Sequence, residues 1–486
     1  MENVKITKEQ IIELIKNRDF PKIREVFEEY PNIDIADALN ELDVEDGDEF
    51  KYIGYLFKVV KPSYTSEVFS ELDDDHREGL IKIFTDKEIA TLFEDINNDD
   101  IADFLEELPA NLTQKVLKNI NAEDRKQVNR LLGYKEDSAG SIMTTEYLTL
   151  LDTDTVSHAL KVIRQTGKSA ETIYTLFVRN LKWDLVGVLN LDDLIFSKDE
   201  ETLIDVCETN FQTVNVNTDQ EEVAQLFKRY DLNAIAVMNE DNKLTGIITI
   251  DDIIDVIEQE TTEDIEAMNQ ITPLENSYTQ TPIMRLVLKC IPWLIVLLVV
   301  SIGAIALQNQ FQPIVAILTV VSIFLTLICD TGGNSGSQSS TLMIRGLSTG
   351  DFELKDYWKI IGKETLAAVF IGLLVGGFAF GWIMFLFAVH IVEIPLDNPQ
   401  NIDPGVGTWL ILSSIVAITL FLTIVLSKFI GGSLPFILTK LKMDPAVIAS
   451  PLISTISDLV SLGLYFGLLY LFLATGCFGV PNPFAG

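Results

Sequence analysis

The C-terminal part of the chain, residues 283–486, contains five long apolar stretches. They span about 286–307, 313–341, 364–390, 408–434 and 445–475. A helix needs roughly 20 apolar residues to cross the hydrocarbon core of a bilayer. Lipid also accepts only segments that satisfy their own backbone hydrogen bonds. These stretches therefore predict a transmembrane domain of five helices, which excludes a wholly soluble fold.

Basic residues predict the orientation of this domain. Of the nine Lys and Arg residues after Pro282, two lie at the entry to the first stretch, four lie in the connection between the second and third, and three lie between the last turns of the fourth and the start of the fifth. These connections share one side of a five-span domain, and the positive-inside rule makes that side cytoplasmic. The N-terminus, MENVKITKEQ, carries no apolar signal segment. We therefore expect a cytoplasmic N-terminus and an extracytoplasmic C-terminus.

Acidic residues are concentrated before the apolar part. The chain holds 36 Lys and Arg against 71 Asp and Glu, of which 9 and 10 follow Pro282. The preceding part is left with 27 basic and 61 acidic residues, a net charge of -34. Such a charge argues against nucleic acid as a partner and suits multivalent cations. It also fits an ordinary soluble acidic surface.

Residues 1–135 contain helical repeats with a spacing of 24 residues. An acidic residue followed by apolar helical positions recurs three times, which predicts stacked helices. Capping of helix N-termini explains one acidic residue per repeat, but not the number in FEDINNDDIADFLEEL. The apolar positions in register are Leu72, Ile96 and Ile120, then Leu80, Phe104 and Val128, and then Phe84, Leu108 and Leu132.

A second repeat occupies residues 136–200 and 201–258. The segment DLVGVLNLDDLI (184–195) matches KLTGIITIDDII (243–254). Each copy reads as a helix, a strand, a Gly turn, a strand and an acidic helix start. The pair resembles tandem CBS domains, which implies one α/β module with a cleft that holds an adenine nucleotide in some relatives. The acidic segment 259–282 joins this module to the first apolar stretch and predicts a coupling helix.

One carboxylate interrupts the last apolar stretch, SPLISTISDLVSLGLYFGLLYLFLA. Asp458 is about thirteen residues into this stretch, and at 1.5 Å per residue it is roughly 20 Å deep, near the middle of the membrane. Ser450, Ser454 and Ser461 share its helical face. We expect no Lys, Arg or His at that depth in the other stretches. Ionisable residues in the bilayer indicate function, so we infer that the counter-ion of Asp458 is not a protein group.

Three alternatives to a channel remain open at this point. The second stretch ends in CDTGGNSGSQSSTLMIRG, which must pack tightly or line water. Its DTG sequence would allow an intramembrane aspartyl protease with Asp330 and Asp458 as an acid–base pair. Aspartic proteases, however, carry DTG on a β-loop, and the GxGD motif is absent. A carrier coupled to Na⁺ or H⁺, and a cation sensor that does not transport, are the other two.

The order of these parts resembles the MgtE family of magnesium channels over essentially the whole chain. The specific motifs are GGNSGSQSSTLMIRGL and LPFILTKLKMDPAVIASPLISTISD. The resemblance implies a multidomain membrane protein with an α-helical repeat domain, tandem CBS (α/β) domains, a linker helix and a five-helix transmembrane domain. It implies a non-enzymatic Mg²⁺ influx channel in the bacterial cytoplasmic membrane, surrounded by lipid. The channel would be a homodimer with its pore on the two-fold axis, closed by Mg²⁺ bound to its acidic cytoplasmic domains.

In the pore, the resemblance assigns metal contacts to Asp458, Asp444 and Glu364, and the lining to Asn334, Ser337, Ser450 and Ser454. Ser337 and Ser450 stand where relatives commonly carry Asn. Asp444 also reads as an ordinary helix N-cap before Pro445, and Glu364 as a surface residue beside Lys363. Selectivity among Mg²⁺, Mn²⁺, Co²⁺ and Ca²⁺ stays open, because all four accept carboxylate and water ligands.

In the acidic part, the resemblance assigns regulatory metal ions to nine carboxylates: Asp99, Asp103, Glu221, Asp231, Asp252, Asp255, Glu260, Glu263 and Asp264. It also implies a possible ATP site in the CBS cleft. Tyr174 and Asp193 are compatible with a nucleotide. Asp192 stands where a relative has Arg, and its charge disfavours phosphate.

Overall fold

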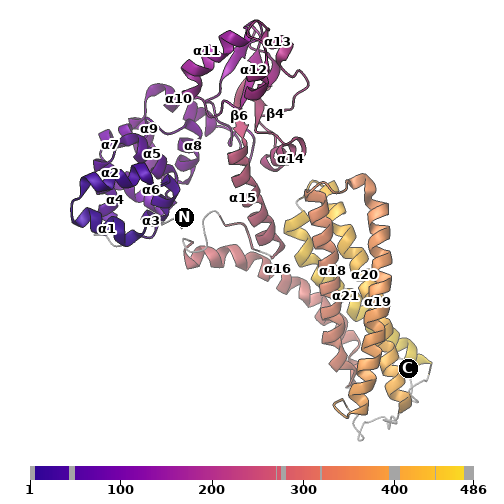
Figure 1. Cartoon of the computed structure of the whole chain (residues 1–486). Helices are drawn as coiled ribbons and strands as arrows, with labels where there is room; N and C mark the ends of the chain where they lie inside the picture. Colours follow the sequence, from indigo (N-terminus) through magenta and orange to yellow (C-terminus); the bar gives the residue numbers. More distant parts are fainter. Residues whose placement is uncertain are drawn as a thin grey trace. The chain divides into compact units, whose positions relative to one another are not determined.

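The structure is a computed structural model that describes residues 6–42, 50–269, 271–274, 281–317, 320–392, 406–443 and 445–475. The chain forms two compact units, Met1–Glu258 and Gln259–Gly486. Each has its own hydrophobic core, and Figure 1 identifies their elements.

The first unit begins with short helices whose apolar faces pack on one core. Leu80, Phe104 and Val128 are buried at equivalent positions of α6, α8 and α10, which confirms the predicted repeat of 24 residues. Phe69 contacts the rings of Phe93 and Phe104 edge-on, with centroids 5.6 and 5.3 Å apart. The helices are α1 (Lys8–Lys16), α2 (Phe20–Glu29), α3 (Asn32–Asn40), α4 (Phe50–Val59), α5 (Pro62–Ser70), α6 (Asp74–Ile83), α7 (Asp86–Leu92), α8 (Asn98–Glu107), α9 (Ala110–Asn119) and α10 (Ala122–Leu131).

Two three-stranded sheets follow, and they confirm the predicted duplication. The orders are β1-β2-β3 and β4-β5-β6, with the first pair of each sheet parallel and the second antiparallel. Both antiparallel pairs shift register at equivalent places, Val178/Arg179 and Val237/Met238. The elements are β1 (Thr149–Leu151), α11 (Val156–Thr166), β2 (Thr175–Arg179), β3 (Leu185–Asn190), α12 (Leu191–Phe196), α13 (Leu203–Val206), β4 (Thr213–Asn215), α14 (Gln220–Tyr230), β5 (Ala234–Met238) and β6 (Leu244–Thr249).

The helix after β6 belongs to both units. Helix α15 (Ile250–Met268) starts where the Thr249 hydroxyl donates a hydrogen bond of 2.7 Å to Asp252 Oδ2. It continues into the first part of the segment predicted to be a linker helix, 259–282, and ends at Met268 after roughly 28 Å at 1.5 Å per residue. Within the second unit, its buried Ala267 packs with Ile344, Leu438 and Ile453.

The second unit consists of long apolar helices. They are α16 (Ile283–Gln310), α17 (Gln312–Ile317), α18 (Val321–Ser348), α19 (Tyr357–Ala388), α20 (Val406–Lys440) and α21 (Pro445–Ala474). Within the described residues, four segments are long and apolar enough to cross a bilayer: Ile283–Gln310, Leu354–Ala388, Val406–Lys440 and Leu452–Ala474. The second predicted span corresponds instead to α17 and α18. Helix α18 is just as long as α16, but its Gly, Ser, Asn and Gln residues lower its hydropathy.

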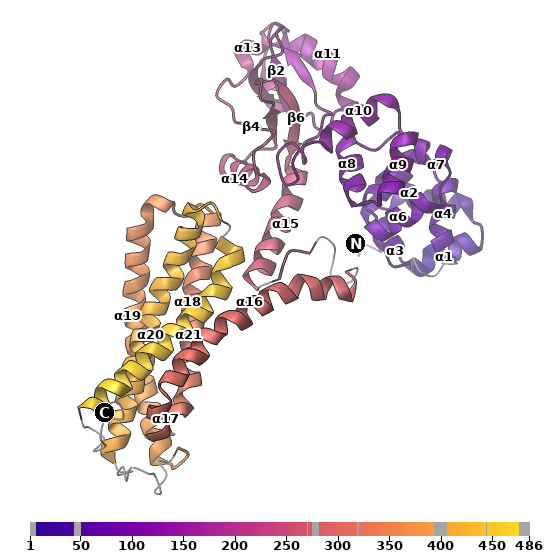
Figure 2. The ribbon, with the colours of Figure 1, turned by 180° about the vertical axis from the view of Figure 1, so that it is seen from behind.

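Helices α18 and α20 approach each other closely through glycine. A methyl group on Gly431 would overlap the carbonyl of Gly336, so the two backbones are in direct contact. Gly332 likewise faces Ser461 of α21, and Figure 2 shows α18, α20 and α21 side by side within this unit. The polar half of α18 is therefore a packing surface on one side, as expected for small residues between membrane helices.

Candidate metal-ion sites

A cavity of about 600 Å³ lies beside Asp458, in the middle of α21. A water molecule occupies about 30 Å³ in the liquid, so the cavity has ample room for a divalent cation that keeps its water shell, as Mg²⁺ tends to do. Its polar lining comes from Gln308 on α16, from Ser322, Thr326, Asp330 and Asn334 on α18, and from Ser454 and Asp458 on α21.

Asp458 has no protein counter-ion in the described part of the chain. Its side chain is half-buried at the cavity wall, and neither an ion pair nor a hydrogen bond joins it to another described residue. The only buried cation close to a carboxylate in the membrane unit, as far as it is described, is Lys428, which contacts Glu364 instead. The carboxylate is thus available to a cation that enters the cavity.

Two of the predicted lining residues, Asn334 and Ser454, reach this cavity. Ser337 does not line the cavity. Its carbonyl accepts a hydrogen bond from the Thr341 hydroxyl, one turn along α18. The side chain of Ser450 and all of Asp444 fall outside the described residues.

The outer face of α18 is polar along several turns. Ser322, Thr326, Asp330 and Asn334 follow one another at intervals of four residues, and all four are exposed in the single chain. At membrane depth such a stripe cannot be left to hydrocarbon. This face must border water or another protein surface.

Glu364 forms a buried ion pair that the sequence did not indicate. Its Oε1 lies 2.9 Å from Nζ of Lys428, and the side chains are only 13% and 4% exposed. The interpretation of Glu364 as a surface residue beside Lys363 is therefore wrong. Lys428, which we placed in the connection between the last two spans, lies inside α20. The ammonium group already neutralises Glu364, so an ion site there has to compete with Lys428.

Replacing Glu364 by Gln should destabilise the protein by about 3 kcal/mol, because it leaves the Lys428 ammonium buried without a counter-charge. The melting temperature in detergent measures this loss. The matched control is Glu353→Gln, which breaks an exposed pair with Lys355 at 2.7 Å and should cost less than about 1 kcal/mol. The double variant Glu364→Gln/Lys428→Met should recover most of the stability. Equal melting temperatures for the two single variants would contradict the assignment.

The first unit gathers carboxylates around the start of α8 and the start of α15. Asp99 is buried, and its Oδ1 accepts a hydrogen bond of 3.2 Å from the Thr144 hydroxyl. Asn97 and Asn98 donate hydrogen bonds of 2.6 and 3.1 Å to Glu171 and Glu146. The acidic cluster, as we call it below, comprises Asp99, Asp100, Asp103, Glu146, Glu171, Asp251, Asp252 and Asp255.

Burial and mutual repulsion raise the pKa values within this cluster. Burial is the larger cause, and it raises the pKa of Asp103 to about 7 together with the charges of Glu106 and Asp100. Burial and the charges of Asp252 and Asp251 raise the pKa of Glu171 to about 7.

The pKa values of Asp252 on α15 and Asp99 on α8 are raised as well. Burial raises the pKa of Asp252 to about 6, against the stabilising hydrogen bond from Thr249. Burial and the Asp100 charge hold the pKa of Asp99 well above its usual range. A divalent cation would relieve this repulsion and compete with protons for the same oxygens.

The other predicted regulatory residues lie elsewhere. Glu221 and Asp231 are at opposite ends of α14, where the Asp231 backbone is left-handed (φ 52°) and caps the helix. Glu260, Glu263 and Asp264 lie on the part of α15 beyond the boundary of the first unit. Among the described residues, no three His, Cys, Asp or Glu side chains converge tightly enough to hold a bare metal ion. Ions at the acidic cluster would therefore keep water ligands.

Sequence reasoning missed part of this cluster. Asp100 lay within the noted acidic run of α8, so its signal was present. Glu146 and Glu171 come from connections in the first CBS repeat, and their proximity to α8 depends on how the helical domain packs against that repeat.

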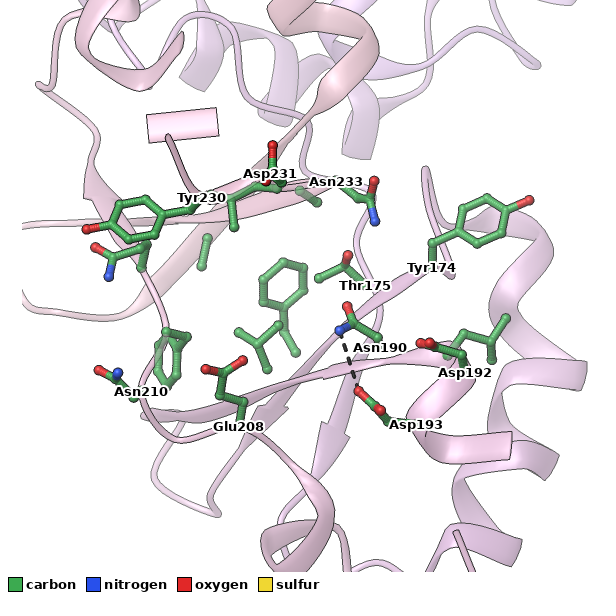
Figure 3. A pocket seen from close by; sticks show the side chains of 18 of the residues that line it. Tyr174, Thr175, Asn190, Asp192, Asp193, Glu208, Asn210, Tyr230, Asp231 and Asn233 are labelled. Atoms are coloured by element: carbon green, nitrogen blue, oxygen red, sulfur yellow. Dashed lines mark hydrogen bonds between the residues drawn. The ribbon is translucent and has the colours of Figure 1, made fainter. Parts of the chain in front are cut away.

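The CBS pair encloses a cleft of about 740 Å³. Tyr174 and Tyr230 lie on opposite sides of it, as Figure 3 shows. Tyr174 and Asp193, both predicted, line the cleft, and Asn190 donates a hydrogen bond of 3.5 Å to Asp193. Its charged lining is wholly acidic and consists of Asp192, Asp193, Glu208 and Asp231.

An acidic helical domain, a CBS pair and a multi-pass helical unit with a carboxylate-lined cavity define a membrane transport protein of the cation-handling class. A family model described as the MgtE divalent cation transporter matches residues 325–468, and the MgtE intracellular N domain matches 49–137. CBS domains match 139–199 and 203–259. The chain belongs to the MgtE family.

Curated relatives extend over nearly the whole chain. The chain is similar to magnesium transporter MgtE of Bacillus subtilis (strain 168), with 31% identity over 96% of this chain and 97% of that protein. Its identity to magnesium transporter MgtE of Thermus thermophilus is 30%, over 95% and 97% of the two chains. A crystal structure of the soluble part of a magnesium transporter shares 30% identity and covers 52% of this chain and 97% of that one, with a TM-score of 0.48. Both relatives are named as transporters.

Proposed function

We propose that this protein conducts Mg²⁺ into the cell through a pore lined by α18 and α21. The observation that carries the proposal is the cavity, large enough for a hydrated ion, in which Asp458 has no protein counter-ion among the described residues. Two carboxylates, amide and hydroxyl groups, and room for retained water suit a cation that sheds its shell reluctantly. The names of the MgtE relatives support Mg²⁺ as the transported ion.

The pore forms between two copies of the chain in this proposal. The exposed polar stripe of α18 then faces its twin across a two-fold axis instead of facing lipid. Two Asp458 carboxylates, one from each copy, repel each other when the pore is empty and attract a divalent cation strongly. Ser337 and Ser450 would shape the water shell along the same path, with Asp444 and Glu364 nearer the cytoplasm.

Closing depends on the acidic cluster. At low Mg²⁺ its carboxylates repel one another, and at millimolar Mg²⁺ hydrated ions bridge α8 and α15. Helix α15 begins beside the cluster and packs at its other end, through Ala267, on α18, α20 and α21. Ion binding thereby biases one of two pore states, with Glu260, Glu263 and Asp264 contributing from the same helix.

The orientation follows the basic residues, with the first unit in the cytoplasm and the C-terminus outside.

In the CBS cleft, we propose that Tyr174 and Asp193 hold the base and ribose of ATP. The acidic lining then requires the phosphates to point outward or to carry Mg²⁺, because Asp192 and Glu208 would repel them.

Purified protein in liposomes tests the main proposal. Mg²⁺ flux that follows the Mg²⁺ gradient and voltage, with no need for a Na⁺ or H⁺ gradient, supports a channel. Flux that requires either gradient supports a coupled carrier, and absence of flux supports a sensor. Competition by Mn²⁺, Co²⁺ and Ca²⁺ in the same assay ranks the ions.

A further inference from the structure

We infer that Asp330 is a second carboxylate of the ion pathway, which concentrates hydrated divalent cations in the outer part of the cavity before they reach Asp458. This inference rests on the proposed conduction of Mg²⁺. It assigns to the DTG sequence of α18 a role in ion entry.

Asp330 and Asp458 reach the same cavity from different helices. Asp330 comes from α18 and Asp458 from α21, and they are close enough for their charges to repel each other. Asp330 is exposed, and it forms no ion pair with another described residue. Glu364, by contrast, has its ammonium partner in Lys428. Asp330 therefore differs from a carboxylate held in a structural ion pair.

The helix register places Asp330 on the outer side of Asp458. Gly332 faces Ser461, and Gly336 faces Ser457, so α18 and α21 run antiparallel. Asp330 is then about one helical turn beyond Asp458, toward the end of the bundle where α16 terminates. In the proposed orientation this is the extracytoplasmic end.

The polar lining continues outward from Asp330. Thr326 and Ser322 follow on the same face of α18, and Gln308 of α16 completes the lining. A fixed negative charge in a low-dielectric vestibule raises the local concentration of cations. A Mg²⁺ ion can respond to it through its retained waters, so Asp330 need not coordinate the metal directly.

The test compares Asp330→Asn with Asp330→Glu and with Asp351→Asn, which removes an exposed carboxylate beyond the other end of α18. Two concentrations are measured in liposomes: the external Mg²⁺ that gives half-maximal flux, and the hexamminecobalt(III), a rigid trivalent analogue of hexahydrated Mg²⁺, that inhibits flux by half. Asp330→Asn should raise both concentrations by about threefold to tenfold at low salt, and less at high salt. Maximal flux should stay within about twofold of wild type, and the other two variants should resemble wild type.

Cys329 gives an independent measurement, because it lines the cavity next to Asp330. In a chain whose other cysteines are replaced by Ser, a cationic thiol reagent should modify Cys329 more slowly once Asp330 is Asn, while a neutral reagent reacts at an unchanged rate. The inference would be overturned if Asp330→Asn left the concentrations for half-maximal flux and half-maximal inhibition unchanged, or if it slowed both thiol reagents equally. Complete loss of flux in a folded Asp330→Asn variant would also overturn it. Absence of flux in the wild type is a different result, which rejects the proposed function itself.

Discussion

Replacing Asp458 by Ala should reduce Mg²⁺ uptake by at least ~100-fold, because the loss of a few kcal/mol of attraction on the pathway corresponds to that factor. The half-buried side chain has no described protein partner, so the substitution should not expose an unpaired buried charge. Uptake in a host that requires external Mg²⁺, together with flux in liposomes, measures the effect.

Two variants separate the charge of Asp458 from its volume. Asp458→Asn keeps the shape and should be nearly as inactive as Ala, whereas Asp458→Glu should retain partial flux because its charge remains. Asp351→Asn removes a carboxylate outside the cavity and should leave uptake unchanged. Near-normal uptake by Asp458→Ala would rule out this residue as the pore carboxylate.

The triple variant Asp99→Asn/Asp103→Asn/Asp252→Asn should fail to close at internal Mg²⁺ concentrations that shut the wild-type pore. Asp99, Asp103 and Asp252 are the carboxylates through which Mg²⁺ would bridge α8 and α15, so their replacement removes the ligands that closing requires. We expect the half-closing concentration to rise by at least about tenfold, within the range of typical coupling free energies. Patch-clamp recording of internal Mg²⁺ titrations measures it.

The matched control removes the same number of charges from the surface. Glu13, Glu25 and Glu28 are exposed on α1 and α2, and their replacement by Gln should leave closing unchanged. If both triple variants shift closing equally, net charge rather than the acidic cluster is the sensor.

The cluster also makes closing depend on pH. Asp103 and Glu171 have pKa values of about 7 in the folded unit, above the ordinary carboxyl values near 4. The folded state therefore binds more protons than the unfolded state between about pH 4 and 7. Without Mg²⁺, the free energy of unfolding should fall as pH rises through that window. Closing should need more Mg²⁺ at about pH 6 than at about pH 8, because protons occupy the ligands. A pH-independent half-closing concentration would contradict this.

Sequence patterns predicted elements whose signal is local. The 24-residue spacing located the buried positions Leu80, Phe104 and Val128, and the duplicated LDDLI and IDDII segments located two equivalent sheets. Asp458 could be singled out because a carboxylate in an apolar helix needs a reason to be there.

Contacts between residues far apart in the chain could not be predicted from the sequence. Lys428 and Glu364 are separated by 64 residues, and only the packing of α19 on α20 reveals their contact. Glu146 and Glu171 join the acidic cluster because the helical domain packs on the first CBS repeat. The sequence also suggested that Ser461 shares a face with Asp458, whereas packing directs it to Gly332 between helices.

The contact between Gly336 and Gly431 limits how the pore can move. No side chain separates the two backbones, so sliding or tilting of α18 against α20 would meet peptide groups immediately, and well-packed surfaces resist such deformation. The pore-facing helix and its neighbour are therefore expected to travel as one rigid wall. In the proposed dimer, the width of the pore would then be set by the separation between the α18–α20 walls of the two subunits, and not by the bending of a helix within either subunit.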